Sequence, residues 1–178
     1  MSLITPMPRT RRVRALTARE ILDFTRFFAG EVRSGKYPYV AYDAESRWHQ
    51  RIYRDQRLDV WIISWLPSQG TQMHDHGGSS GSFSVLSGRL SEAVFGRSAG
   101  VTEFGRAAGS IVGFGPQYVH DVRNLGEEPA VSVHAYSPPL TAMNYYEVDD
   151  GALVRLATVA TEDPEPDARF GTVTSVAS

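Results

Sequence analysis

The stretch MHDHGGSSGSFSVLSG, from Met73 to Gly88, contains two histidines separated by one residue. Positions i and i+2 of a β-strand point to the same face, so His74 and His76 would present both imidazoles to one side of a sheet. Imidazole nitrogens that converge inside a barrel are suitable ligands for a divalent transition metal. A pair with this spacing arises by chance in roughly one such chain in ten, so the pair alone is moderate support for a metal site.

A third histidine strengthens this interpretation. His120 lies in GFGPQYVHDVRN, which predicts a strand after a Gly-Pro turn. Two histidines on one strand and one on a later antiparallel strand can occupy three corners of a coordination face, with positions open for substrate and oxygen, as at non-haem iron sites. Asp75 should face away, and the first acid after His76 is Glu92. The predicted ligands are three neutral imidazoles, which leave iron(II) its full charge and favour an anionic ligand such as a thiolate.

The segment VSVHAYSPP contains a second row of polar side chains. Ser132, His134 and Tyr136 alternate along a predicted strand, so they share one face and can form a hydrogen-bond chain that orients the tyrosine hydroxyl. The spacing alone fits a simpler interpretation slightly better, in which Tyr136 and His134 only hydrogen-bond to each other in the solvated mouth of a barrel. Pro138 permits, but does not require, a cis bond after Ser137.

The Gly/Ser run after the histidines matches a hydrolase pattern without its context. Residues 77–81 read G-x-S-x-G, the nucleophile-elbow motif, with Ser79 as the nucleophile. That motif requires a strand-to-helix turn, whereas SFSVLSGRLSE predicts strand, turn and strand. Ser79 is therefore interpreted as a turn residue.

The elements that must position these residues are a helix and a series of short strands. TAREILDFTRFFAGEVRSG predicts a helix that begins with a capping box of Thr17 and Glu20 and ends at Gly30 or Gly35. From about residue 58, short segments rich in β-branched and aromatic residues are separated by Gly and Pro turns. This pattern predicts an all-β sandwich or barrel with minor α structure.

The chain divides into one expected domain and two tails. Residues 1–15 are a basic arm, residues 16–157 a single domain that includes the helix, and residues 158–178 an acidic, proline-containing extension. The basic arm is expected to be a solvated tail rather than a binding element.

Composition excludes several classes of protein. The 178 residues are 42% hydrophobic and 21% charged, as in an ordinary globular domain. A formal net charge of −2 argues against a general nucleic-acid-binding protein, and no window approaches the roughly 20 apolar residues of a membrane span. The chain has no cysteine, so disulfides and thiolate metal ligands are excluded. No secretory signal is predicted at the N-terminus, which makes the cytoplasm the default location.

Three segments, HDHGGSSGSFSVLSGRLSE, YVHDVRN and AVSVHAYSPPL, together closely resemble the cysteine dioxygenase family of cupins. The resemblance covers roughly residues 45–148, and the three segments agree in order and spacing. It implies a cupin, a jelly-roll-like β-barrel, that uses iron(II) and dioxygen to convert a thiol, typically L-cysteine, to its sulfinic acid. By this resemblance His74, His76 and His120 are the iron ligands, Ser132, His134 and Tyr136 are the family's Ser-His-Tyr triad, and Trp65 stands where the family has a tryptophan beside the substrate.

One departure from the family concerns a covalent link. Some members join a cysteine to the active-site tyrosine, and the place of that cysteine is Gly81 in this chain. A Cys–Tyr crosslink is therefore impossible, and Tyr136 must act as an unmodified phenol. Iron binding and turnover are not expected to depend on the link.

A second departure concerns the substrate carboxylate. Cysteine-selective members bind it with an arginine on an early strand, because a guanidinium can hold a carboxylate through two hydrogen bonds. The segment SRWHQRIYRDQR offers Arg51 as the best match, with Arg47 and Arg54 nearby. A shift of one or two residues would place His49 or Gln50 there instead, and relatives that prefer 3-mercaptopropionate carry glutamine.

The expected protein is therefore a non-haem iron dioxygenase for a small thiol, with L-cysteine favoured over 3-mercaptopropionate. Its partners are the thiol and dioxygen, without nucleic acid or membrane, and a monomer is favoured. An alternative of another class is a non-catalytic cupin that binds a metal or small ligand. That alternative keeps the three histidines but gives no reason for Ser132, His134 and Tyr136 to match the family.

Overall fold

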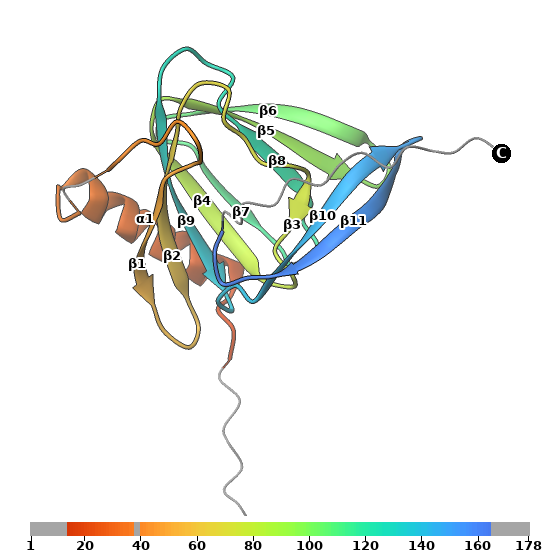
Figure 1. Ribbon diagram of the computed structural model, residues 1–178. Coiled ribbons are helices and arrows are strands. Elements are labelled where there is room, and N and C mark those ends of the chain that lie inside the picture. The colour runs from red at the N-terminus through yellow and green to blue at the C-terminus, as the bar shows by residue number, and fades with distance from the viewer. Residues whose placement is uncertain (1–13, 38–39, 165–178) are drawn as a thin grey trace, which may run out of the picture.

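The computed structural model describes residues 14–37 and 40–164, which form one helix packed against two antiparallel β-sheets (Figure 1). The predicted fold class, all-β with minor α structure in a cupin-type barrel, is confirmed. Nearly all of the expected basic arm and most of the acidic extension lie outside the described residues.

The helix forms where the sequence predicts it. Helix α1 (Ala18–Arg33) begins after Thr17, whose hydroxyl accepts a hydrogen bond from the Glu20 N–H, while the Glu20 carboxylate accepts one from the Thr17 N–H. This reciprocal pair is the predicted capping box. The helix ends before Gly35, whose φ of +81° is a conformation that glycine adopts without steric cost.

Eleven strands follow the helix in the described part of the chain. They are β1 (His49–Arg54), β2 (Asp59–Trp65), β3 (His74–Asp75), β4 (Ser80–Ser87), β5 (Arg89–Gly96), β6 (Gly100–Ala107), β7 (Ile111–Phe114), β8 (His120–Arg123), β9 (Ala130–Ser137), β10 (Ala142–Asp149) and β11 (Ala152–Ala160). The five-stranded sheet has the order β1-β2-β9-β4-β7, and the six-stranded sheet the order β11-β10-β3-β8-β5-β6.

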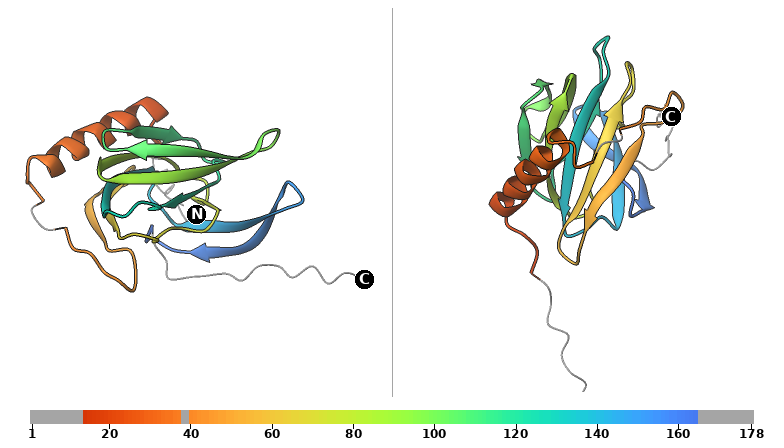
Figure 2. Two further views of the ribbon diagram at one scale, coloured as in Figure 1. Left: turned by 90° about the horizontal axis from the view of Figure 1, so that it is seen from above. Right: turned by 90° about the vertical axis from the view of Figure 1, so that its left-hand side faces the viewer.

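The two sheets face each other and enclose the barrel interior, while α1 covers the outer face of the five-stranded sheet (Figure 2). Strand β9 is buried along its whole length, because its two faces meet different layers. Val131, Val133 and Ala135 belong to the cluster that packs against α1, whereas Tyr136 belongs to the cluster inside the barrel.

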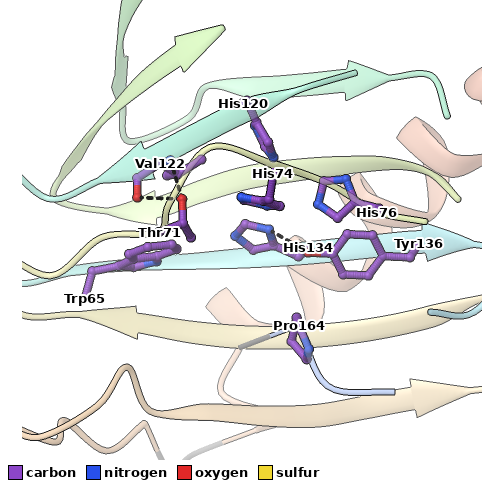
Figure 3. A pocket seen from close by; sticks show the side chains of 9 residues that line it. All are labelled: Trp65, Thr71, His74, His76, His120, Val122, His134, Tyr136 and Pro164. Carbon is purple, nitrogen blue, oxygen red and sulfur yellow. Dashed lines mark hydrogen bonds between the residues drawn. The ribbon is translucent and has the colours of Figure 1, made fainter. Parts of the chain in front are cut away.

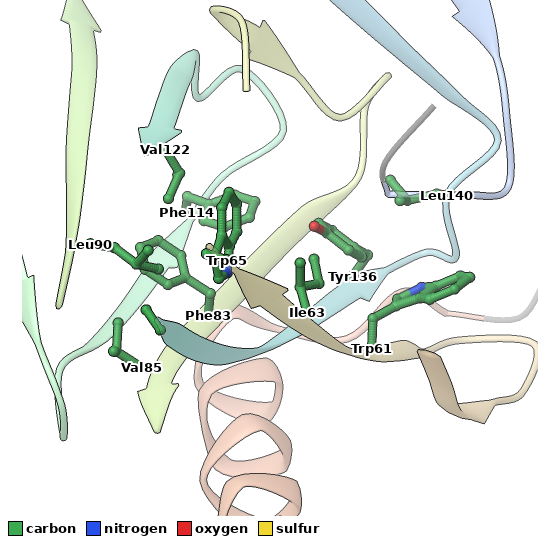
Figure 4. Packing of buried hydrophobic residues seen from close by; sticks show 11 residues of the cluster. Trp61, Ile63, Trp65, Phe83, Val85, Leu90, Phe114, Val122, Tyr136 and Leu140 are labelled. Atoms are coloured by element: carbon green, nitrogen blue, oxygen red, sulfur yellow. The ribbon is translucent and has the colours of Figure 1, made fainter. Parts of the chain in front are cut away.

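The barrel core is aromatic and lies beside the predicted site. Figure 4 shows its members, among them Trp65 and Phe83, both almost fully buried, with Phe114 and Tyr136. A buried large side chain contributes about 1.5–3 kcal/mol relative to an exposed one. This core therefore fixes the walls from which the polar side chains of the site project.

Some expected boundaries change in detail. Strand β11 continues to Ala160, beyond residue 157, where the domain was expected to end. The peptide bond before Pro138, which the sequence left open, is cis. Ser79 lies in a turn and is followed by β4 rather than by a helix, so the nucleophile-elbow interpretation is excluded. Among the described residues, no helix has the length and apolar character needed to cross a membrane.

Candidate metal centre

The three predicted metal ligands come together inside the barrel (Figure 3). His74 lies on β3 and is paired directly with His120 on β8, while His76 follows immediately after β3. One nitrogen from each ring can be chosen such that all three lie within 4.8 Å of one another. All three side chains are buried, which is unusual for such polar groups unless they have partners.

Hydrogen bonds to the outer nitrogens orient two of the rings. His74 Nδ1 lies 2.7 Å from the carbonyl oxygen of Gln72, and His120 Nδ1 lies 2.9 Å from Glu92 Oε1. Nδ1 must donate in both pairs, which leaves the lone pair on Nε2 for a metal. The buried Nδ1 of His76 has no hydrogen-bond partner among the described residues. A metal ion bound by these rings would satisfy the buried polar cluster, so the residues fit a divalent cation.

The electrostatic environment keeps the site in its ligating form. Burial lowers the pKa of His74 and His76 well below the usual histidine value, and neighbouring histidines add to the effect. Burial likewise lowers the pKa of His134 to about 3. These imidazoles are therefore neutral near pH 7, as metal binding requires.

Asp75 points away from the histidines, as expected for the residue between two that share a face. Its Oδ1 accepts hydrogen bonds from the Gly77 N–H (2.8 Å) and from Asn144 Nδ2 (2.7 Å). Its Oδ2 accepts one from the Tyr146 hydroxyl at 2.6 Å. The carboxylate thus pins the short strand β3 to β10 and stays outside the ligand set.

A buried carboxylate behind His120 was not assigned a role from the sequence. Glu92 is fully buried on β5, and its Oε1 accepts hydrogen bonds from His120 Nδ1 and from the Tyr118 hydroxyl (3.0 Å). Its Oε2 lies 2.6 Å from Arg106 Nη2. Burial alone would raise the pKa of Glu92, but His120 and Arg106 outweigh it, so the pKa lies below its usual value. The charged carboxylate fixes the tautomer and direction of one predicted ligand.

The second polar row forms a continuous chain on β9. Ser132 Oγ lies 2.8 Å from His134 Nε2, and the Tyr136 hydroxyl lies 3.4 Å from His134 Nδ1. Trp65 extends the chain, because its indole N–H donates to Ser132 Oγ at 2.8 Å. Burial raises the pKa of Tyr136 far above its usual range, with the charge of Asp59 as a second cause. The phenol therefore keeps its proton.

Close packing surrounds Gly81, where crosslinked relatives have a cysteine. Gly81 on β4 is paired with Tyr136 on one side and with Phe114 on the other. A Cβ added at Gly81 would lie 2.4 Å from Phe114 Cζ and 2.9 Å from the carbonyl oxygen of Ala135. The Phe114 ring also stacks on His76, with ring centroids 4.8 Å apart. Phe114 thus fills the space beside Gly81 and supports a predicted ligand at the same time.

The arginine predicted to bind the substrate carboxylate lies outside the cavity wall. Arg51 Nε forms an ion pair with the buried Asp59 at 3.1 Å, and its Nη2 donates to the carbonyl oxygen of Glu162 at 2.7 Å. Its guanidinium lies 4.3 Å above the ring of Trp61. These contacts hold Arg51 on the face of β1 that it shares with Trp61, away from the residues that line the cavity, and its role in substrate binding stays a prediction.

A second arginine of the same segment lies nearer to the histidines. The guanidinium of Arg47 lies 5.4 Å from the ring centre of Trp65 and donates to the carbonyl oxygen of Gly70. Its positive charge contributes to the lowered pKa values of His74 and His134, after the larger effect of burial. The sequence placed Arg47 near the expected position but could not show which arginine turns inward.

The cavity beside the histidines is small. Its wall consists of Trp65, Thr71, His74, His76, His120, Val122, His134, Tyr136 and Pro164 (Figure 3). The space has room for about one water molecule. The three predicted ligands therefore face one common cavity with His134 and Tyr136 of the second polar row, and Pro164 forms part of its wall.

Fold and site together define a cupin whose barrel encloses three histidines able to hold a metal ion. The model of the family described as cysteine dioxygenase type I matches residues 14–149. The chain belongs to this family, which places it among dioxygenase-type cupins.

The solved structure of one bacterial protein supports the barrel fold. The protein TT1209 from Thermus thermophilus is 23% identical to this chain, and the match covers 58% of this chain and 93% of that one, with a TM-score of 0.51. An uncharacterised protein with a double-stranded β-helix domain from Klebsiella pneumoniae is 20% identical, with 67% and 91% of the two chains covered and a TM-score of 0.49. At these identities the likeness concerns the fold alone.

Proposed function

We propose that this protein is an iron(II) thiol dioxygenase that converts L-cysteine and dioxygen to cysteine sulfinic acid. The observation that carries the proposal is the common cavity faced by three buried histidines and by His134 and Tyr136, with Ser132 hydrogen-bonded to His134 behind them. Membership of the cysteine dioxygenase type I family supports the same reaction class.

The reaction balances without a further reductant. A thiolate sulfur loses four electrons, dioxygen gains four, and both oxygen atoms end on sulfur as a sulfinate. Iron(II), when bound, supplies a Lewis-acidic, redox-active cation with positions open to thiolate and dioxygen. His74, His76 and His120 would hold it, and Glu92 would keep His120 in the ligating tautomer.

The hydrogen-bond chain supports a specific role for Tyr136. Trp65 donates to Ser132 Oγ, so the Ser132 hydroxyl proton finds its acceptor at His134 Nε2. His134 then carries its proton on Nδ1 and donates to the Tyr136 oxygen. In this arrangement the Tyr136 O–H is left to donate into the cavity. A positioned donor of this kind stabilises negative charge that develops as dioxygen is reduced.

The substrate carboxylate would be held by an arginine of the β1 region. Arg51 is the candidate from the family resemblance, although its guanidinium is already bound to Asp59 and to Glu162. Arg47 lies closer to the cavity, against Trp65. Relatives that prefer 3-mercaptopropionate carry glutamine at the carboxylate-binding position, and this chain has Gln50 beside Arg51, so 3-mercaptopropionate is a second candidate substrate.

The deciding experiment is oxygen consumption by the iron-loaded protein with L-cysteine, 3-mercaptopropionate and cysteamine, with the product identified by mass spectrometry. The proposal expects a sulfinate and one dioxygen consumed per thiol. Tyr136→Phe should lower kcat because it removes the donor, whereas Tyr42→Phe, at a position that is 47% exposed, serves as the matched control. Metal binding without consumption of any thiol would favour the non-catalytic cupin instead.

A further inference from the structure

Among the described residues, the wall of the metal cavity contains one residue from beyond the last strand. Pro164 follows β11, whereas the other lining residues lie on β2, β3, β8 and β9 or on segments hydrogen-bonded to them. A cavity with room for about one water molecule cannot admit a thiol such as 3-mercaptopropionate, which has six non-hydrogen atoms. Part of the wall must therefore move before such a molecule reaches the histidines, and the paired strands are the least movable part.

The segment that carries Pro164 is held by polar contacts to β1. We call residues 161–164 the strap. The Glu162 carbonyl oxygen accepts from Arg51 Nη2 at 2.7 Å, and Glu162 Oε2 lies 3.1 Å from Arg54 Nη1. Asp163 Oδ2 lies 3.0 Å from His49 Nε2. The strap thus places its own oxygens on the basic side chains of the segment predicted to bind a substrate carboxylate.

The side chains that hold the strap are partly exposed to solvent. The side chains of Glu162 and Asp163 are 66% and 43% exposed, and that of Arg54 is 27% exposed. Ion pairs with this exposure contribute little each, because water screens the charges and the long side chains lose freedom. Pro164 is the buried residue of the strap, and it is not a member of the barrel core cluster.

We propose that the strap is a displaceable cover of the metal cavity, which opens when a small ligand binds and whose acidic oxygens give up their basic partners to a ligand carboxylate. The proposal rests on the proposed function only in taking small thiols as ligands. Strap and ligand compete, so weakening the strap should improve the binding of every small ligand of the metal by the same factor, with or without a carboxylate.

The test uses full-length protein loaded with cobalt(II), which binds thiols without turnover. Glu162→Gln/Asp163→Asn is compared with wild type and with Asp149→Asn/Asp150→Asn, a matched loss of two exposed charges at the β10–β11 turn. The dissociation constants of 3-mercaptopropionate and cysteamine are read from the thiolate-to-cobalt absorption band. Loss of two exposed ion pairs predicts constants about threefold to tenfold lower for both thiols in the strap variant, and no change in the control.

A second readout keeps the strap testable if thiols do not bind. The rate at which dipicolinate removes cobalt is measured in the range where it depends on chelator concentration, and it should rise by a similar factor in the strap variant alone. Unchanged thiol affinities together with an unchanged rate of cobalt removal would contradict the proposal that the strap covers the cavity. Faster removal of cobalt from a strap variant that binds neither thiol would support the strap as a cover and would count against the proposed dioxygenase activity.

Discussion

Adding one methyl group at Gly81 should destabilise the protein through a specific collision. The Cβ of Gly81→Ala would lie 2.4 and 2.5 Å from two ring atoms of Phe114 and 2.9 Å from the carbonyl oxygen of Ala135. The backbone carbonyl belongs to the central strand β9 and cannot retreat, so the Phe114 ring has to move. That ring is stacked on His76, and the disturbance therefore reaches a predicted metal ligand.

The magnitude follows from two opposing effects. Inserting a methyl group into a filled core costs typically about 1–3 kcal/mol. Replacing glycine by alanine restricts the unfolded chain and returns about 0.4–1 kcal/mol, because the backbone at Gly81 does not adopt a positive φ. The expected net loss is about 1–2 kcal/mol of unfolding free energy, which for a chain of this length lowers the Tm by about 2–8 °C.

The assay is urea and thermal unfolding of the metal-free protein, arranged as a double-mutant cycle with Phe114→Leu. The leucine lacks the two ring atoms in the collision, so the cost of Gly81→Ala should fall by at least half in that background. Gly115→Ala, where an added Cβ meets nothing within 4 Å, is the control and should change stability by less than about 0.5 kcal/mol. An equal cost of Gly81→Ala in both backgrounds would refute the packing argument.

Four further variants test the site itself. His120→Ala should abolish stoichiometric metal binding, measured by elemental analysis after dialysis, while retained metal would contradict the three-histidine centre. Glu92→Gln should weaken metal affinity about 10- to 100-fold in competition titrations. The pKa of Glu92 is lower in the folded than in the unfolded protein, so its contribution to stability is present above the unfolded pKa and is lost as pH falls through the folded pKa. The difference in unfolding free energy between wild type and Glu92→Gln should therefore shrink below about pH 4.5. Of Arg47→Gln and Arg51→Gln, the variant at the carboxylate-binding position should raise KM for 3-mercaptopropionate but not for cysteamine, and equal effects on both thiols would place the carboxylate elsewhere.

The sequence predicted the features that depend on local spacing. Alternation along a strand puts His74 and His76, and likewise Ser132 and Tyr136, on shared faces, because side chains repeat every two residues. The capping box of α1 is equally local and is confirmed. The position of His120 beside His74 and His76 depends on strand order, which local spacing does not predict and which was taken from the family resemblance.

The features that the sequence did not predict depend on contacts between distant segments. Glu92 was noted only as the first acid after the histidines, since nothing local indicates that it lies behind His120. The direction of Arg51 depends on Asp59 across the β1–β2 pair and on Glu162 more than a hundred residues later. Phe114 beside Gly81 is likewise a cross-strand neighbour whose significance depends on register.

The brevity of β3 has a mechanical consequence for the six-stranded sheet. This two-residue strand is paired with β10 at Asp75 and His74 and with β8 at His74, and the segment before it adds a bridge from Gly70 to Arg123 and a backbone hydrogen bond from Thr71 to Val122. This seam has fewer paired residues than the β10–β11 and β5–β6 hairpins on either side, so amide hydrogen exchange should be faster there than in those hairpins. A metal ion held by His74 on one side and His120 on the other would bridge the seam. Coordination would then link the two halves of the sheet where few backbone hydrogen bonds join them, so the cation would stabilise the fold as well as take part in the reaction.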